Sequence, residues 1–203
     1  MNVAALYDVH GMPWALEAVL AEVDADAIVF GGDLADGPYD DEVLALARSV
    51  DAHWIRGNTE ADDLPLTVEL DGVTYCHATP TDNVRMTTAR TPDADLVEMF
   101  GPSGTFVIGH THHQFDRRVG GLRVINAGSI GMPYESEVAA FWTLVVDGEP
   151  QFRRTAFDVG AAADRIRASD WNARDEFVAE NLLVPFPRDA AIAVFEEQRS
   201  ASG

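Results

Sequence analysis

Residues 3–33 read VAALYDVHGMPWALEAVLAEVDADAIVFGGD, and two hydrophobic patterns alternate along them. The apolar runs Val3–Tyr7 and Ala25–Phe30 have the length and composition of buried strands. Between them, the segment Met12–Val23 carries its apolar residues at helical spacing. The alternation continues with an amphipathic helix over Asp41–Val50 and a third strand over His53–Arg56. This β-α-β-α-β order predicts an α/β protein whose parallel strands are covered by helices.

The middle of the chain carries hairpin signals. Asp71-Gly72, a strong hairpin dipeptide, separates the strand candidates Leu66–Leu70 and Val73–His77. Two short helices are expected over Asp82–Arg90 and Pro92–Phe100. Further strands are expected over Phe106–Gly109, Gln114–Val119, Leu122–Asn126, Ala140–Val146 and Gln151–Phe157. We therefore expect two sheets, one mainly parallel and one mainly antiparallel.

The last part of the chain is acidic and helical in pattern. Helices are expected over Ala161–Ala168, Arg174–Leu183 and Asp189–Arg199. No stretch is rich enough in Gly, Pro or Ser to mark a linker. We expect one domain over residues 1–203, with residues 160–203 forming a helical C-terminal extension that packs on the core or mediates dimerisation.

Composition and charge exclude several classes of function. Of the 203 residues, 47% are apolar and 24% charged, the balance of a soluble globular chain. Thirty-four acidic residues against fourteen arginines give a net charge of −20, which repels polymeric nucleic acid and anionic membranes. No apolar run is long enough to span a bilayer, and no basic segment opens the chain, so a cytoplasmic location is expected. A single cysteine, Cys76, agrees with a reducing compartment.

Seven side chains that can bind a metal come directly after strand candidates. They are Asp8, His10, Asp33, Asn58, His77, His110 and His112. The carboxyl ends of neighbouring strands open onto one edge of a sheet, where ligand sites form. Asp-x-His and His-x-His triplets place both side chains on the same side of an extended segment, so each pair can bind one ion. Any one of these residues alone is more often a turn cap or a core histidine, but together they favour a site for two divalent metals.

The order of these residues resembles the signature of the calcineurin-like metallophosphoesterases. That signature contains Asp-x-His, Gly-Asp, Gly-Asn, a single His and Gly-His-x-His. It appears here as Asp8-Val9-His10, Gly32-Asp33, Gly57-Asn58, His77 and Gly109-His110-Thr111-His112. A later segment, Asn126–Pro133, resembles the Asn-Pro-Gly-Ser-x-Gly element of the small bacterial and archaeal YfcE-like phosphodiesterases.

The resemblance implies a fold and a set of ligands. The fold is the metallophosphoesterase fold, a four-layer α/β/β/α sandwich of two mixed sheets. One ion would be held by Asp8, His10 and His112, the other by Asn58, His77 and His110, with Asp33 bridging both. A hydroxide shared by the two ions would attack phosphorus, so Asp33 and Asn58 are the expected catalytic residues. From the resemblance we expect two divalent ions, Mn²⁺ first, with Fe, Zn²⁺, Ni²⁺, Co²⁺ or Mg²⁺ as alternatives.

Two positions depart from larger relatives. Thr59 follows Gly57-Asn58 where many of them carry a histidine, and threonine cannot donate a proton near neutral pH, which favours substrates with good leaving groups. Gly37 stands where protein phosphatases carry a phosphate-binding arginine, which disfavours a phosphoprotein substrate. Arg56 and Thr59 are the expected substrate-binding residues.

The expected function is metal-dependent hydrolysis of a small-molecule phosphoester, with phosphodiesters favoured over monoesters. The alternative is a binding or scaffold module of the same fold with little or no turnover. A homo-oligomer is left open. Loss of ligand residues would be the sequence sign of a scaffold, and all seven candidates are present.

Overall fold

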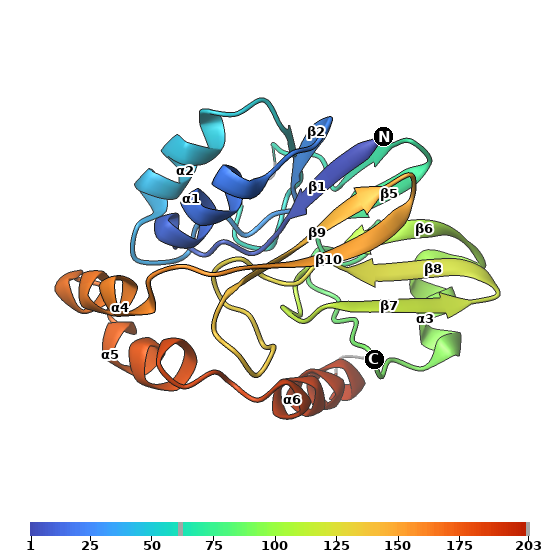
Figure 1. Ribbon diagram of the computed structural model, residues 1–203. Helices are drawn as coiled ribbons and strands as arrows, with labels where there is room; N and C mark the ends of the chain where they lie inside the picture. Colours follow the sequence, from blue (N-terminus) through green and yellow to red (C-terminus); the bar gives the residue numbers. More distant parts are fainter. Residues whose placement is uncertain (61–62, 202–203) are drawn as a thin grey trace.

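The computed structural model describes residues 1–60 and 63–201 (Figure 1). In this described part of the chain, ten strands form two five-stranded sheets, which we call sheet A and sheet B. Sheet A has the strand order β10-β9-β1-β2-β3 and contains β1 (Asn2–Leu6), β2 (Ala27–Phe30), β3 (His53–Trp54), β9 (Ala140–Val146) and β10 (Glu149–Thr155). Sheet B has the order β4-β5-β6-β8-β7 and contains β4 (Thr67–Leu70), β5 (Val73–Cys76), β6 (Ser103–Ile108), β7 (Phe115–Val119) and β8 (Gly121–Asn126).

Both sheets are mixed, as the family resemblance implies, whereas the expectation from the strand order of one mainly parallel and one mainly antiparallel sheet is wrong. In sheet A, β1–β2 and β2–β3 pair in parallel, whereas β9 pairs antiparallel with both β1 and β10. In sheet B, β5–β6 and β6–β8 are parallel, and β4 and β7 add antiparallel edges. The difference arises because the chain returns to sheet A through β9, next to the strand with which it began.

Three clusters of apolar side chains separate four layers. Alternate residues of β1 face opposite ways: Ala4 and Leu6 pack under α1 (Pro13–Glu22) and α2 (Asp40–Arg48), whereas Val3 and Ala5 face sheet B. The outer face of sheet B is covered by α3 (Asp93–Phe100) through Leu96 and Phe100. This arrangement confirms the predicted α/β/β/α sandwich (Figure 1).

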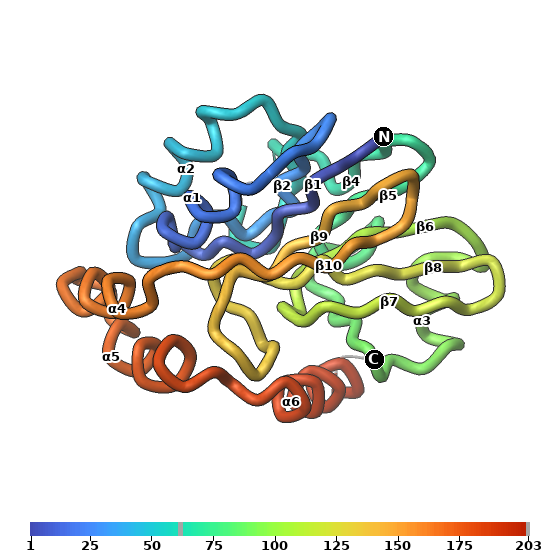
Figure 2. The backbone as a smooth tube through the Cα atoms, in the orientation of Figure 1, coloured from blue at the N-terminus to red at the C-terminus, as the bar shows by residue number. Residues whose placement is uncertain are grey.

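The C-terminal part is helical, as expected, but one predicted helix is divided. It contains α4 (Val159–Ala168), α5 (Arg174–Phe177), a π-helical turn over Val178–Leu182 and α6 (Arg188–Ala201). The single helix expected over Arg174–Leu183 therefore changes its hydrogen-bonding pattern after Phe177. In Figure 2, α6 runs beside the loop between β8 and β9, where the backbone N–H of Arg188 donates to Ser136 Oγ at 2.9 Å. Within the described residues, every helix is too short or too polar to cross a membrane.

The helix expected over Asp82–Arg90 is absent, and these residues form an irregular loop. Its backbone is bonded to short polar side chains instead: Asp82 N–H donates to Thr79 Oγ1, and Thr88 N–H donates to Thr91 Oγ1. Threonine, asparagine and aspartate compete with helical hydrogen bonds in this way. The loop matters below because it passes beside the candidate metal centre.

Candidate metal centre

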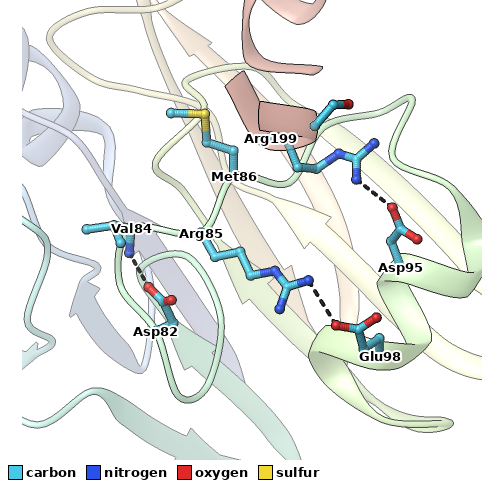
Figure 3. A pocket seen from close by; sticks show the side chains of 8 residues that line it. Asp82, Val84, Arg85, Met86, Asp95, Glu98 and Arg199 are labelled. Carbon is cyan, nitrogen blue, oxygen red and sulfur yellow. Dashed lines mark hydrogen bonds and ion pairs between the residues drawn. The ribbon is translucent and has the colours of Figure 1, made fainter. Parts of the chain in front are cut away.

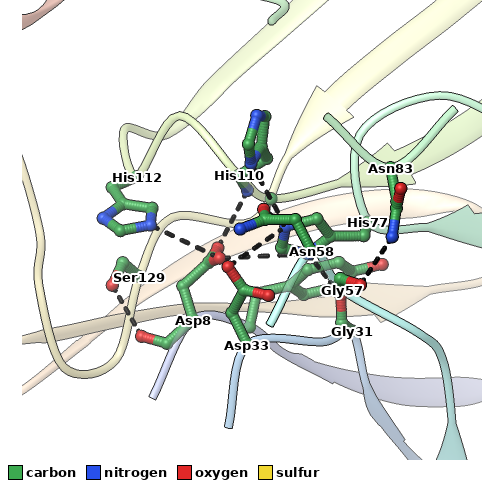
Figure 4. A network of polar contacts seen from close by, with 12 residues as sticks. Asp8, Gly31, Asp33, Gly57, Asn58, His77, Asn83, His110, His112 and Ser129 are labelled. Atoms are coloured by element: carbon green, nitrogen blue, oxygen red, sulfur yellow. Dashed lines mark hydrogen bonds and ion pairs between the residues drawn. The ribbon is translucent and has the colours of Figure 1, made fainter. Parts of the chain in front are cut away.

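The candidate ligands meet where strands of both sheets end. Asp8 and Asp33 follow β1 and β2 of sheet A, and His77 and His110 follow β5 and β6 of sheet B. Figure 4 shows these side chains, with Asn58 and His112, directed toward one another. The parallel pairs β1–β2 and β5–β6 place these ends at one edge of the sandwich, as the sequence predicts.

The backbone at these residues is not extended, which corrects one step of the sequence argument. The ligand candidates Asp8, His10, Asp33, His110 and His112 have φ angles of 55°, 48°, 53°, 66° and 54°. A left-handed conformation costs a non-glycine residue about 1–2 kcal/mol, so five such residues in one place must be held by the surrounding structure. The paired side chains therefore converge because tight loops turn them inward, not because of strand periodicity.

Two loops of sheet A hold each other in this conformation. Asp8 N–H donates to Gly32 O at 3.1 Å, and His10 N–H donates to Asp33 O at 3.0 Å. A third loop approaches from sheet B, where His110 N–H donates to Asp8 Oδ2 at 3.0 Å. These bonds satisfy backbone groups that a strained loop would otherwise leave unpaired.

Two glycines of the motifs are required by close approach. A Cβ atom at Gly57 would lie 2.1 Å from Asp33 Oδ1, and one at Gly109 would lie 2.4 Å from Asp8 Oδ2. In each case the clash is with a carboxylate of the site itself. Glycine before a ligand residue is therefore what allows carboxylates from another loop to reach the centre.

The first group of side chains contains Asp8, His10 and His112. Their ligand-type atoms all lie within 4.8 Å of one another, and all three residues are buried. His10 Nε2 is 3.3 Å from His112 Nε2, and Asp8 Oδ1 is 3.4 Å from the same His112 atom. Three donors around one point are what a single ion requires.

The second group contains Asp33, His77 and His110, again within 4.8 Å. His77 Nε2 lies 3.2 Å from His110 Nδ1 and 3.0 Å from Asn58 Oδ1, so the amide of Asn58 joins this group. Asp33 Oδ2 is 3.5 Å from His77 Nε2 and 4.0 Å from His10 Nε2. The Asp33 carboxylate thus lies between the two groups.

Three histidines are oriented by backbone carbonyls outside the centre. His77 Nδ1 is 2.9 Å from Gly31 O, His112 Nδ1 is 2.8 Å from Met132 O, and His110 Nε2 is 3.1 Å from Val84 O. A carbonyl accepts only from an N–H, so when a ring is neutral, as a metal-bound imidazole is, its other nitrogen carries a lone pair directed inward. This outward N–H to carbonyl bond is the usual support of a metal-binding histidine.

The electrostatics of the centre favour a cation. Burial raises the pKa of Asp8, but His112 and His77 outweigh it and leave that pKa below its usual range. Burial also raises the pKa of Asp33, but the hydrogen bond and charge of His77 outweigh it and leave that pKa below its usual range. Burial lowers the pKa of His77, but Asp33 and Asp8 raise it to about 9. Two carboxylates that remain ionised at such depth need compensating positive charge.

The residues present fit metal ions. Asp8 Oδ1 is buried and, within the described residues, has no hydrogen bond of good geometry. A buried carboxylate oxygen without a partner is costly, and an ion between Asp8, His10 and His112 would satisfy it. The mixture of imidazole, carboxylate and amide donors suits Mn²⁺, Fe, Co²⁺, Ni²⁺ or Zn²⁺.

Comparison with known families agrees with this geometry. The profile of the calcineurin-like phosphoesterase superfamily domain matches residues 1–149, which include both groups of ligand-type side chains. The chain belongs to this superfamily. This confirms the resemblance seen in the sequence and makes the chain a member of a metal-dependent hydrolase family. No curated protein matches the chain.

Solved structures share the calcineurin-like phosphoesterase fold. A metallophosphoesterase from Sphaerobacter thermophilus has a TM-score of 0.70 and 19% identity, over 83% of this chain and 94% of that one. The hypothetical protein PH1004 from Pyrococcus horikoshii OT3 has a TM-score of 0.72 and 17% identity, over 87% and 97%. The E. coli phosphoesterase YfcE has a TM-score of 0.53 and 20% identity, over 78% of this chain and all of that one. At these identities the likeness shows the fold alone.

The two predicted substrate-binding residues of this calcineurin-like chain lie in different surroundings. Thr59 donates to Asp33 Oδ1 from both its N–H (3.0 Å) and its hydroxyl (3.2 Å), so it orients the carboxylate between the two groups. Arg56 is half-buried one residue before Gly57, and its N–H donates to Pro65 O at 2.9 Å. A substrate contact for either residue stays a prediction.

Glu60 is a site residue that the sequence analysis missed. Its carboxylate accepts three backbone N–H groups: Asp33 at 2.9 Å, Leu34 at 2.8 Å and Gly57 at 2.8 Å. It therefore ties the loop after β2 to the loop after β3. The signal was present, because Glu60 stands three residues after Gly57, the spacing of a side chain that caps a turn.

The segment Asn126–Pro133, at the end of β8, is hydrogen-bonded to two of the loops that carry ligand candidates. Asn126 Nδ2 donates to Gly109 O at 2.6 Å, and Ser129 Oγ donates to Asp8 O at 2.8 Å. Both residues belong to the element that resembles the YfcE-like one. His113, next to the ligand candidates, is fully buried, with Nδ1 2.7 Å from Thr111 O and Nε2 accepting from Ala89 N–H at 3.3 Å. The hydrogen bonds of Asn126, Ser129 and His113 are those of structural residues.

Proposed function

We propose that this chain is a dinuclear-metal-dependent phosphodiesterase that hydrolyses a small-molecule phosphoester. The observation that carries the proposal is the pair of three-residue groups, with the Asp33 carboxylate between them. Two ions held a few ångströms apart clamp both the attacking and the leaving oxygen of an in-line displacement at phosphorus.

Each residue of the centre has a role in this proposal. Asp8, His10 and His112 would hold one ion and Asn58, His77 and His110 the other, with Asp33 bridging. When bound, the ions would polarise the phosphoryl oxygens and lower the pKa of a water molecule toward neutrality. Thr59 and Glu60 keep the Asp33 loop in place, and Asn58, which is exposed, lies where substrate enters.

The chain offers no proton donor to the leaving group at the position after Gly57-Asn58. The hydroxyl of Thr59 at this position is directed to Asp33 Oδ1. The absence of an acid at this position favours leaving groups that depart as anions, so turnover should fall as the pKa of the leaving group rises.

Charge supports a diester over a monoester. A phosphodiester carries one negative charge, whereas a phosphomonoester carries between one and two near neutral pH. A protein of net charge −20 repels the second charge more strongly. Four positive charges from two divalent ions would offset this repulsion locally and let a small anion bind.

Hydrolysis of chromogenic esters tests the proposal. Metal-stripped protein would be assayed with a nitrophenyl phosphodiester and the matching monoester, with Mn²⁺, Zn²⁺, Ni²⁺ or Mg²⁺ added back separately. We expect activity only with metal, highest with Mn²⁺, and greater on the diester. Absence of turnover with any ion, while calorimetry shows two ions bound, would overturn the enzymatic proposal in favour of a binding module.

A further inference from the structure

A cavity of about 770 Å³ is lined in part by the loop that contacts His110 of the second group of ligand candidates. Asn83 Nδ2 donates to Gly57 O at 2.6 Å, beside Asn58, and Val84 O lies 3.1 Å from His110 Nε2. The next two residues of the loop, Arg85 and Met86, line the cavity (Figure 3). One short loop therefore touches the centre through Asn83 and Val84 and contributes Asp82, Val84, Arg85 and Met86 to the cavity wall.

The other walls come from α3 and from the end of α6. Asp95 and Glu98 of α3 and Arg199 and Ser200 of α6 complete the lining. Helix α6 lies outside residues 1–149, the part that matches the superfamily. The cavity is thus built partly from the shared fold and partly from a segment beyond it, as expected of a feature that sets specificity within a family.

The charges of the lining are nearly balanced. Arg85 Nη2 lies 3.0 Å from Glu98 Oε1, and Arg199 Nη1 lies 2.5 Å from Asp95 Oδ2. Asp82 adds a third carboxylate, so the lining has three acidic and two basic groups. Both guanidinium groups already have anionic partners, and the remaining charge is negative, so a second phosphate group on the substrate would be repelled.

The lining offers donors and acceptors side by side. Arg85 and Glu98 are 44% and 68% exposed, and an ion pair so exposed contributes little, so both groups can turn toward a ligand. Neighbouring guanidinium donors and carboxylate acceptors match hydroxyl groups, which donate and accept at once. Val84 and Met86 add an apolar surface for C–H groups.

We propose that this cavity is a substrate subsite that binds a neutral, hydroxyl-rich ester group, such as a glyceryl or sugar group, on a phosphodiester. The proposal rests on the proposed phosphodiesterase function and adds the class of the second ester group. The cavity volume is within the range of small-molecule sites, and Arg85 is the residue that sets the preference.

Three matched nitrophenyl phosphodiesters test the subsite. Their second ester group is methyl, glyceryl, or glyceryl bearing a terminal phosphate. We expect kcat/KM for the glyceryl ester to exceed that for the methyl ester by about tenfold, the effect of one or two added hydrogen bonds. The phosphorylated ester should fall below the glyceryl ester.

Two variants of the same loop separate the subsite from general effects. Arg85→Met should reduce the glyceryl-to-methyl ratio to about one-tenth of the wild-type ratio. Arg90→Met is the matched control, because Arg90 forms a similar exposed ion pair with Asp189, at 2.7 Å, but does not line the cavity, and it should keep the wild-type ratio. A wild-type ratio near one, or equal ratios in wild type and Arg85→Met, would overturn the subsite.

Failure of the proposed function remains distinguishable from failure of the subsite. If the methyl ester is not hydrolysed with any metal, calorimetric titrations of metal-loaded protein with glycerol phosphate and methyl phosphate replace the kinetics. Tighter binding of glycerol phosphate that Arg85→Met abolishes would support the subsite without turnover. Equal affinities would reject it.

Discussion

Asp33 joins the two halves of the candidate centre through one carboxylate. Its Oδ1 accepts two hydrogen bonds from Thr59, and its Oδ2 faces His77 at 3.5 Å and His10 at 4.0 Å. Its backbone is held in a left-handed conformation by His10 and Glu60. One oxygen is thus anchored by the protein while the other is directed toward both groups.

Asp33→Asn should reduce phosphodiesterase turnover by at least ~100-fold and lower the number of bound Mn²⁺ ions from two toward one, because the neutral amide is a poor bridge between cations. The change keeps the volume of the side chain. Metal content by atomic absorption and turnover of the nitrophenyl diester are the measurements. Asp36→Asn is the control, an exposed aspartate on the same loop, and should retain both. Two bound ions and near-normal turnover in Asp33→Asn would refute the bridging role.

Glu60→Gln should weaken Mn²⁺ binding by ~10–100-fold, as loss of a residue that orients ligands does in other metal sites. The amide cannot accept all three backbone N–H groups that the carboxylate accepts. Calorimetry with Mn²⁺ and the electron paramagnetic resonance signal of coupled Mn²⁺ pairs report on metal geometry separately from stability. Glu69→Gln on β4 is the control. An unchanged coupled signal with only a lower melting temperature would assign Glu60 a purely structural role.

Some residues of the candidate centre could be predicted from the sequence, and others could not. The seven ligand candidates could be named because each follows a strand and belongs to an ordered motif. The bonds of Glu60 could not be named, because two of its three partners lie 26 and 27 positions earlier in the chain. Only the pairing of β2 with β3 brings those loops together.

Among the secondary-structure elements, two hairpins are determined by the backbone conformation of their turn residues. Asp71 and Gly72 have φ angles of 52° and 76°, and Asp147 and Gly148 have φ angles of 50° and 80°. Two successive positive φ angles are typical of the tight turns that suit the twist of paired strands. Both hairpins, β4–β5 and β9–β10, could therefore be predicted from two residues each.

Gly148→Ala should destabilise the fold by about 1 kcal/mol, because alanine is strained at this positive φ. Gly160→Ala, in the first turn of α4, should have the opposite sign and stabilise by up to about 1 kcal/mol, because its nearest contact would be an ordinary 3.4 Å from Asp158 Oδ1. Urea denaturation measures both. Effects of the same sign would contradict this account of the two glycines.

The elements that sequence patterns missed are those governed by distant contacts. The loop over residues 82–90 is held by Glu196 of α6, whose Oε1 accepts from Thr88 Oγ1 at 2.6 Å and Thr91 Oγ1 at 3.0 Å. Its position on sheet B also allows Val84 to contact His110. Local helix propensity contains no information about contacts with residues so far away in the sequence.

At the scale of the whole molecule, α6 bridges two loops that flank the centre. Arg188 Nη1 lies 2.6 Å from Glu135 Oε2 in the loop before β9. Glu196 Oε1 accepts a hydrogen bond from Thr88 Oγ1 in the loop before α3. Tyr134, in the first of these loops, stacks on His112 with ring centroids 5.3 Å apart and contacts Phe186 and Phe195. The C-terminal helices therefore pack on the core beside the candidate ligands. Packing on the core is one of the two roles expected for them from the sequence.

Glu196→Ala should raise the KM of the nitrophenyl diester severalfold with a smaller change in kcat, because the loop that contacts Gly57 and His110 loses its anchor. The Glu196 carboxylate also pairs with Arg199, whose Nη2 lies 2.8 Å from Glu196 Oε2. Glu197→Ala, at the adjacent position on α6, is the control for general effects of removing a carboxylate from this helix. Steady-state kinetics with saturating Mn²⁺ give both constants. A lowered melting temperature with unchanged KM would mean that α6 only stabilises the fold.

The net charge of −20 acts on the molecule as a whole. Self-repulsion among thirty-four acidic side chains destabilises the compact state, and salt screens it. The melting temperature should therefore rise by several degrees between about 0.05 and 1 M KCl, where the Debye length falls to about 3 Å. Differential scanning calorimetry checks this, and a flat or falling melting temperature would contradict it.

Patterns along the chain were enough to predict most of the strands and helices, two tight hairpins, the family and the residue types gathered at the strand ends. These depend on local spacing, turn chemistry and ordered motifs, all of which are readable along the chain. Only the tertiary structure revealed the left-handed ligand loops, the hydrogen bonds of Glu60 to the loop after β2 and the cavity at the end of α6. Each of these arises from contacts between segments far apart in sequence, and the energy of such contacts overrides the preference of any single segment.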